Sequence, residues 1–388
     1  MRYNFETVDE LIESDITNGF PGAALQVSHK GKILKHSAYG YKLRYNSEYK
    51  EVPFPEGMEL DTVFDMASNT KIFAITFVAM MMVEKGLLDL DKPLADILPS
   101  FNTHDDITPR MLLSHCAGYG PEIWFFDNKN PHGKEFYSQE REPTERLLLK
   151  APLEYEPLSK TVYSDTGFML LGIVIEYILR KDLSEAAKDL IYNPLELKNT
   201  TFLPLNNGID VSRIAATSIG NTCNGTMDYP NIRTDLIRGE VQDEKAFYSM
   251  GGVAGHAGLF STPSDVIRMC EEVQNVYHEG CSRLLSRETL MDFLTPTGKD
   301  ETFGCGWRIN KKHKVSNLFG NKSSELTIGH SGFTGTLSLI DLKNHLSVVL
   351  LTNKVHSFCY DRKHYAGSDF PTGKYAPIMD EIYNCLNL

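Results

Sequence analysis

The chain has 388 residues, of which 41% are hydrophobic and 23% are charged, and these proportions are ordinary for a globular protein. Its 39 basic and 51 acidic residues give a net charge of −12, which disfavours nucleic acid or an anionic membrane as the main partner. A chain of this length can bury a large core, either as one domain or as two lobes.

The seven cysteines are scattered along the chain and include no Cys-x-x-Cys pair. This pattern predicts neither a disulfide framework nor a zinc site, and it favours a reducing compartment. The N-terminus has no apolar signal region, and the longest apolar run, 72–83, is about a dozen residues where a membrane helix needs roughly 20. We therefore expect a soluble, cytoplasmic protein with no transmembrane segment, or a periplasmic or extracellular one if an export signal precedes this sequence.

The first predicted element is an amphipathic helix from Phe5 to Ile16, where apolar residues recur at helical spacing. A glycine-containing turn then separates two short strands, 23–27 and 33–36, and this arrangement predicts an antiparallel hairpin. The helix would cover one face of the sheet to which the hairpin belongs.

The middle of the chain, residues 66–299, is dominated by helical patterns and long loops. Apolar segments predict helices at 72–83 and 168–179, the second capped by Asp165 or Thr166. A long loop region is expected over 119–160. Two further helices should begin where a capping threonine precedes a proline, at Thr108-Pro109 and Thr262-Pro263.

Strand patterns return after residue 300, and a helix is predicted at the C-terminus over 376–388. The two ends of the chain would build one antiparallel sheet flanked by the terminal helices. The expected fold is α/β (α+β) in a single domain, 1–388. Its sheet lobe would comprise residues 1–65 and 300–388, and residues 66–299 would form an inserted all-α lobe. A functional site at the seam between lobes is the default expectation.

Ser68 and Lys71 stand three residues apart at the mouth of the apolar segment 72–83. On a helix they would share one face, with Ser68 near the helix start, where free N–H groups favour developing negative charge. This is a reasonable place for a nucleophilic hydroxyl beside an amine. The spacing is not specific by itself, because Ser47 and Lys50 repeat it in a polar stretch with no apolar helix.

Two later motifs support the Ser68 hypothesis. Tyr163-Ser164-Asp165 precedes the helix at 168–179 and offers a phenol that can shuttle a proton, although, taken alone, a simple helix-capping turn is the favoured interpretation. His330-Ser331-Gly332-Phe333 lies among the late strands, where a backbone can approach a ligand closely, although a hairpin turn with a surface histidine is as simple. A third stretch, glycine-rich over 251–258, matches no phosphate-binding loop, and we expect its His256 to be structural.

Taken in order, Ser-x-x-Lys, Tyr-Ser-Asp and His-Ser-Gly are far more specific than any one of them. The sequence resembles the serine β-lactamase and penicillin-binding-protein superfamily, in a class C-like branch. Within it the resemblance is strongest to the penicillin-binding protein 4B group, through segments 230–234, 239–252 and 255–261. It covers essentially the whole chain and implies a β-lactamase/DD-peptidase-like fold with no cofactor and no metal.

The resemblance also implies roles for individual residues. Ser68 would attack a carbonyl and form an acyl-enzyme, with Lys71 and Tyr163 handling protons. The N–H groups of Ser68 and Phe333 would form the oxyanion hole, a contribution of roughly 3–4 kcal/mol per donor. His330, with Ser331 and Gly332 beside it, would orient the proton network or a substrate carboxylate.

The sequence departs from the wider superfamily pattern at two motifs. Asp165 stands where Asn is usual, and His330-Ser331 stand where Lys-Thr occur in β-lactamases, so efficient β-lactam hydrolysis is not expected. An ionised Asp165 would hold Lys71 protonated, and Tyr163 would then carry more of the base role.

The substrate is expected to be a small peptide, an ester or a β-lactam. The leading hypothesis is a penicillin-binding D-alanyl-D-alanine carboxypeptidase, and the alternatives are an esterase or D-amino-acid peptidase on the same scaffold or a non-catalytic binding homologue. No Gly-x-Ser-x-Gly elbow or His-Glu-x-x-His motif occurs, so α/β-hydrolases and zinc peptidases are disfavoured.

Overall fold

The computed structural model describes residues 3–101, 103–104 and 106–388. Its α-helices are α1 (Glu6–Thr17), α2 (Phe77–Glu84), α3 (Leu94–Ile97), α4 (Pro109–Leu113), α5 (Arg141–Leu148), α6 (Asp165–Leu179), α7 (Leu183–Ala187), α8 (Pro263–Glu279), α9 (Arg287–Phe293), α10 (Ser316–Phe319), α11 (Pro371–Lys374) and α12 (Ala376–Leu386). Its strands are β1 (Gly22–His29), β2 (Lys32–Tyr45), β3 (Glu51–Gly57), β4 (Phe64–Asp65), β5 (Thr201–Phe202), β6 (Leu259–Ser261), β7 (Arg308–Ile309), β8 (Thr327–Ser331), β9 (Thr336–Asp341), β10 (Leu346–Thr352), β11 (Cys359–Asp361) and β12 (His364–Tyr365).

Strands from both ends of the chain form one seven-stranded antiparallel sheet, in the order β3-β2-β1-β10-β9-β8-β7. The two ends meet where β1 pairs with β10, with Ala24 opposite Leu351. All eight residues of β1 are buried, as expected of a strand covered on both faces. The predicted hairpin and the joint sheet are therefore confirmed.

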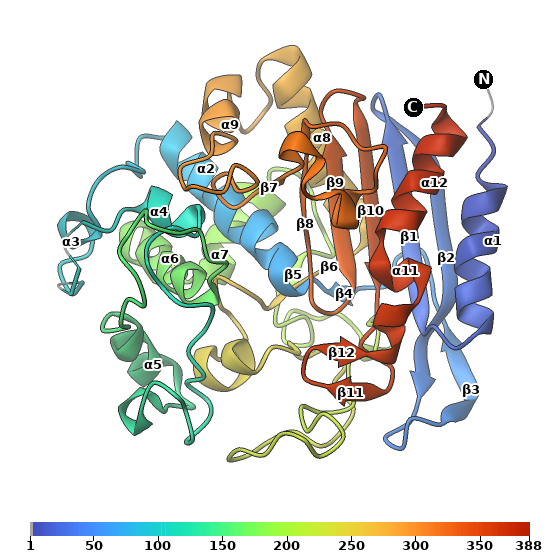
Figure 1. Cartoon of the computed structure of the whole chain (residues 1–388), viewed down its shortest axis with the longest axis horizontal. Helices are drawn as coiled ribbons and strands as arrows, with labels where there is room; N and C mark the ends of the chain where they lie inside the picture. Colours follow the sequence, from blue (N-terminus) through green and yellow to red (C-terminus); the bar gives the residue numbers. More distant parts are fainter. Residues whose placement is uncertain (1–2, 102, 105) are drawn as a thin grey trace.

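The terminal helices α1 and α12 lie side by side over one face of the sheet (Figure 1). Val8 and Ile12 of α1 join Ile378 and Ile382 of α12 in a buried cluster with alternate residues of β1, such as Leu25. This packing follows from the period of two in a strand, which sends every second side chain to the same face. The two predicted terminal helices are confirmed.

The opposite face of the sheet is covered by α8, which contacts β1, β9 and β10. Thr262 caps this helix by accepting a hydrogen bond from Asp265 N at 3.3 Å, and Pro263 occupies its first turn. Gln274 donates to the carbonyl oxygens of Asp341 and Leu346 at 3.3 and 3.1 Å. Although α8 falls within the range expected for the helical lobe, it packs on the sheet, and the division into two lobes stays a prediction.

Three local expectations need correction. The apolar segment after Ser68 begins with a π-helical turn, Lys71–Thr76, before α2 continues it, because Thr76 Oγ1 donates to the Lys71 carbonyl at 2.8 Å. Helix α6 is capped by Ser164, not by Asp165 or Thr166, since Ser164 Oγ accepts from Gly167 N at 3.3 Å. The loop region 119–160 contains helix α5.

The scattered cysteines predicted no disulfide framework, yet Cys223 and Cys359 form a disulfide across 136 residues of sequence. Only the folded chain brings the loop around residue 223 to the β11–β12 hairpin, so spacing alone could not reveal the pair. Disulfides persist in oxidising environments, and the cysteines therefore no longer favour a reducing compartment.

Over the described residues, we find no helix with the length and apolarity needed to cross a membrane.

We expect Cys359→Ser to lower the free energy of unfolding by about 2–4 kcal/mol, because the disulfide closes a long loop and restricts the unfolded chain. Urea unfolding without reductant would measure the loss, and dithiothreitol should produce a similar shift in the unsubstituted protein. Cys281→Ser is the matched control, since Cys281 is exposed and unpaired. Identical unfolding curves for Cys359→Ser and Cys281→Ser would contradict the prediction.

Candidate active site

Ser68 sits on a turn whose backbone is held in an uncommon conformation. Ala67, directly before it, has φ +44°, a region that residues with a Cβ occupy only when their surroundings impose it. The buried Asp65 imposes it here, because its carboxylate accepts hydrogen bonds from Ala67 N at 2.9 Å and Gln242 N at 2.7 Å. Asp65 was not predicted as a site residue, although it stands three positions before Ser68.

The same turn is bound to the sheet on its other side. Thr334 Oγ1 donates to the carbonyl of Asp65 at 2.7 Å, and Thr336 Oγ1 donates to that of Met66 at 3.0 Å. Asn69 Nδ2 donates to Thr336 Oγ1 at 3.0 Å. Asn69 and the backbone of Asp65 and Met66 therefore attach the turn to the β8–β9 connection and the start of β9.

Lys71 is fully buried and contacts Ser68. Its Nζ lies 3.1 Å from Ser68 Oγ, 2.7 Å from Asp165 Oδ1 and 3.3 Å from the carbonyl oxygen of His256. Burial is the largest single influence and would lower the pKa of Lys71, but Asp165 and Tyr163 together outweigh it through charge and hydrogen bonds, and the pKa lies above its usual value. Lys71 is therefore an ammonium group at neutral pH, as the presence of Asp165 had predicted.

Tyr163 lies between Lys71 and the late strands. The Lys71 ammonium is 4.7 Å from the centre of the Tyr163 ring, and the ring centre of His330 is 5.7 Å away on the other side. Burial raises the pKa of the Tyr163 hydroxyl, and Lys71 only partly offsets this rise. The pair of Lys71 and Tyr163 therefore keeps both protons at neutral pH.

His330 is a neutral imidazole in this site. Burial, reinforced by the Lys71 charge, lowers the pKa of His330 to about 3. Its Nδ1 lies 2.7 Å from the carbonyl oxygen of Ser331, which can only accept, so Nδ1 carries the proton. Nε2 is then an acceptor, and it is buried with no hydrogen-bond partner among the described residues.

Two cavities, of about 330 and 390 Å³, flank Ser68, and Ser68, Tyr163 and Phe333 line both. The first also holds Asp165, and the second holds His330 and Ser331. Gly332 packs beneath them, where a Cβ would fall 2.5 Å from the carbonyl oxygen of Met66. All eight predicted site residues thus gather around one centre, while Ser47 and Lys50 lie on the β2–β3 turn.

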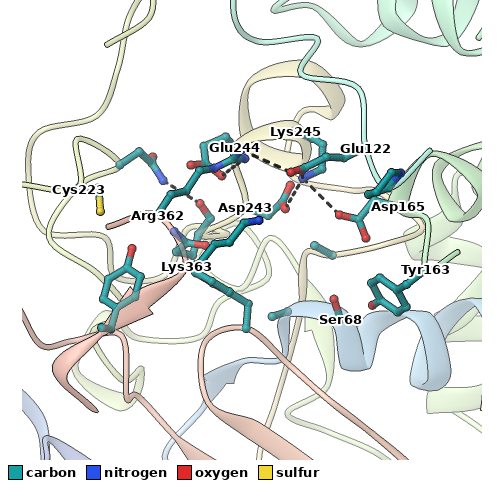
Figure 2. Close-up of a pocket in the computed structure, with 17 residues that line it drawn as sticks. Ser68, Glu122, Tyr163, Asp165, Cys223, Asp243, Glu244, Lys245, Arg362 and Lys363 are labelled. Carbon is teal, nitrogen blue, oxygen red and sulfur yellow. Dashed lines mark hydrogen bonds and ion pairs between the residues drawn. The ribbon is translucent and has the colours of Figure 1, made fainter. Parts of the chain in front are cut away.

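The first cavity contains a cluster of charged residues that the sequence did not reveal (Figure 2). Lys245 Nζ lies 2.7 Å from Glu122, 3.0 Å from Asp243 and 3.3 Å from Asp165. Arg362 reaches Glu122 at 3.4 Å. Glu122, Asp165, Lys245 and Arg362 come from four segments far apart in sequence, and no local pattern marks the cluster.

Asp165, Asp243 and His256 each direct a possible metal-ligand atom into one region, within 4.8 Å of one another. The set does not fit a metal ion, because the Lys245 ammonium already contacts both carboxylates. His256 Nε2 in turn lies 2.8 Å from Asp243 Oδ1. The expectation that His256 is structural agrees with this position.

Comparison with known proteins identifies the family. Residues 8–368 match the Beta-lactamase family. The chain belongs to this family. It is 40% identical to the N-acetylmuramyl-L-alanine amidase of Bacillus subtilis (strain 168), over 98% of this chain and 88% of that protein. It is 37% identical to a candidate D-alanyl-D-alanine carboxypeptidase of Salmonella gallinarum, over 98% of this chain and 90% of that protein.

The fold is also similar to that of solved proteins. The octameric penicillin-binding protein homologue from Pyrococcus abyssi superposes with a TM-score of 0.68 at 20% identity, covering 99% of this chain and 78% of that one. The β-lactamase/DD-peptidase-like fold, an antiparallel sheet with helices, is therefore confirmed, and the protein is a serine hydrolase of the Beta-lactamase family.

We expect Asp165→Asn to shift the rising limb of the pH–rate profile to lower pH, by roughly 1–3 units. The carboxylate stabilises the protonated form of Lys71, so its neutralisation lets the Lys71–Tyr163 pair lose a proton more easily. The measurement is kcat/KM for p-nitrophenyl acetate between pH 5 and 10. An unchanged profile, or an alkaline shift, would contradict the prediction.

Proposed function

We propose that this hydrolase is a D-alanyl-D-alanine carboxypeptidase that acts through an acyl-enzyme on Ser68. The observation that carries the proposal is a guanidinium, that of Arg308, in the cavity shared by Ser68, Tyr163 and His330. A carboxypeptidase must recognise the free carboxylate of the last residue, and a guanidinium is the group best suited to do so.

Arg308 has no carboxylate within ion-pair distance among the described residues. It extends from β7, which pairs with β8 so that Arg308 lies opposite Gly329, beside the His330 motif. Its guanidinium stacks 3.9 Å above the Phe303 ring and forms no ion pair with any carboxylate of the described residues. Burial lowers the pKa of Arg308, and a partly desolvated cation of this kind favours an anionic ligand.

His330 supports this assignment indirectly. Because it is neutral, it offers no charge to a substrate carboxylate, so the charged contact falls to Arg308. The unpartnered Nε2 of His330 would accept a hydrogen bond, from Tyr163 or from the substrate. The sequence analysis left His330 to orient either the proton network or a substrate carboxylate. We now assign the proton network to His330 and the carboxylate to Arg308.

The reaction would begin once the Lys71–Tyr163 pair has lost one proton. Asp165, 2.7 Å from Lys71, keeps the remaining proton on the amine, so Tyr163 is the phenolate. Ser68 Oγ attacks the carbonyl carbon while its proton passes to Tyr163, and the N–H groups of Ser68 and Phe333 would stabilise the oxyanion. The tetrahedral intermediate then expels D-alanine, whose amine takes the proton from Tyr163.

Deacylation would reverse these proton transfers. Water attacks the ester carbonyl and gives a proton to Tyr163, and the ester bond to Ser68 Oγ breaks. The proton on Tyr163 returns to the serine alkoxide, which restores the starting state. Lys71 remains an ammonium throughout and holds Ser68 in place through the 3.1 Å contact.

An N-acetylmuramyl-L-alanine amidase is the second candidate. The observation that favours it is the 40% identity to the Bacillus subtilis relative of that name, spread over 98% of this chain. Both activities cleave an amide next to an alanine, and both would use the same Ser68 chemistry. They differ in whether the acyl group is a peptide or a muramyl sugar.

The test incubates the purified protein with a peptide ending in D-Ala-D-Ala and, separately, with an N-acetylmuramyl-L-alanine peptide, and follows products by mass spectrometry. We expect release of D-alanine from the first substrate and a covalent adduct with labelled penicillin on Ser68. Ser68→Ala should abolish both. Product from the muramyl substrate alone would favour the amidase, and Ser68-independent turnover of the D-Ala-D-Ala peptide would reject the mechanism.

Arg308→Met should lower kcat/KM for a D-Ala-D-Ala peptide by about tenfold to a hundredfold, as expected when a hydrogen bond to a charged group of roughly 1.5–3 kcal/mol is lost. Hydrolysis of p-nitrophenyl acetate should stay near the unsubstituted rate, since this ester has no carboxylate. Methionine keeps the apolar packing over Phe303. Equal losses on both substrates would mean that Arg308 does not select the carboxylate.

A further inference from the structure

Lys245 is a second buried lysine near the reaction centre, and the mechanism above does not use it. It opens a π-helical turn, Lys245–Ser249, and its side chain is only 3% exposed. Its ammonium contacts three carboxylates, Glu122, Asp243 and Asp165. A buried ammonium group stays charged only when opposite charges compensate for its lost hydration. The three carboxylates provide that compensation for Lys245.

Asp165 is shared between two ammonium groups. Its Oδ1 accepts from Lys71 at 2.7 Å, and its Oδ2 lies 3.3 Å from Lys245. Figure 2 shows the dashed contact running from Lys245 to Asp165, which lies above Ser68 and Tyr163. The Asp165 carboxylate therefore compensates part of the positive charge of Lys71 and part of that of Lys245.

The contacts close into a ring. Beyond Lys245, Asp243 Oδ1 lies 2.8 Å from His256 Nε2, and the carbonyl oxygen of His256 accepts from Lys71 at 3.3 Å. Lys71 is thus reached from Lys245 by two routes, through Asp165 and through Asp243 with His256. A change of charge or length at Lys245 acts on both.

The charge on Lys245 is retained at working pH. Burial opposes it, but the surrounding carboxylates raise the pKa of Lys245 well above its usual value. The charged or titratable groups that face Lys245 are Glu122, Asp165, Asp243, Glu244 and Arg362. Those that face the pair of Lys71 and Tyr163 are Asp165, His115, His330 and Arg308.

We propose that Lys245 is a positioning residue that sets how readily the Lys71–Tyr163 pair gives up the proton needed for acylation. A like charge nearby disfavours the protonated form of a group. Lys245 partly neutralises Asp165, so Asp165 holds the proton on the pair less firmly than an unshared carboxylate would. Glu122 has the opposite effect on the pair. Its negative charge partly neutralises Lys245, which leaves more of the Asp165 charge to hold the proton on Lys71 and Tyr163. This inference rests on the proposed Ser68 chemistry.

Lys245→Met removes the charge while keeping an unbranched side chain. We expect the rising limb of kcat/KM for p-nitrophenyl acetate to move about one pH unit to higher pH, with activity at pH 7 falling about tenfold. Glu122→Gln should move the limb to lower pH. Opposite shifts from two neighbouring substitutions are a signature that mere loosening of the site would not produce.

Lys42→Met is the matched control, because Lys42 is also buried and paired with an acid, Glu59 at 2.8 Å, on β2. Its profile should coincide with that of the unsubstituted protein. Profiles of Lys245→Met and Glu122→Gln that do not move, or that move in the same direction, would overturn the proposal.

If Lys245→Met does not fold, Glu122→Gln decides alone, since an acid shift supports the proposal and an unmoved limb rejects it. The rate of Ser68→Ala is subtracted at each pH. A Ser68→Ala rate equal to that of the unsubstituted protein would instead reject the proposed function itself, so the two failures are distinguishable.

Discussion

The buried ion pair between Lys71 and Asp165 is the contact on which the rest of the site depends. It joins the turn after β4 to the first turn of α6, two segments separated by 94 positions in sequence. Two charges buried together must satisfy each other, because each has lost its hydration. The pair therefore fixes where Ser68 stands relative to Tyr163, and it determines which of the two basic groups holds a proton.

Three parts of the fold hold the two segments that carry Lys71 and Asp165 in place. The sheet supplies the β8–β9 connection, to which Asn69 and the neighbouring backbone are fastened. Asp65 holds the strained backbone at Ala67. Ser164 takes the capping position of α6, which leaves the Asp165 carboxylate free to face Lys71. Binding and catalytic groups held on such a rigid frame keep their geometry between turnovers.

The charges around the site divide the proposed work. On one side of Ser68, Arg308 has no acidic partner among the described residues and suits an anionic substrate. On the other side lies a group of charges that are paired with one another: Lys245, Glu122, Asp243 and Arg362. Because these charges are already paired, they are better suited to adjusting the proton affinity of Lys71 and Tyr163 than to binding a charged substrate. The disulfide at Cys223 borders that second side.

The sequence by itself determined the terminal helices, the hairpin, the joint sheet and the motif residues, because these depend on local periodicity, capping and the order of Ser68, Tyr163 and His330 along the chain. Tertiary structure alone decided the pairing of Cys223 with Cys359, the place of α8 on the sheet, and the roles open to Arg308 and Lys245. Each of these depends on which distant loops meet in space. The protonation of Lys71 depends on both. The sequence placed Asp165 in the motif, and the tertiary structure brought its carboxylate to 2.7 Å from Lys71.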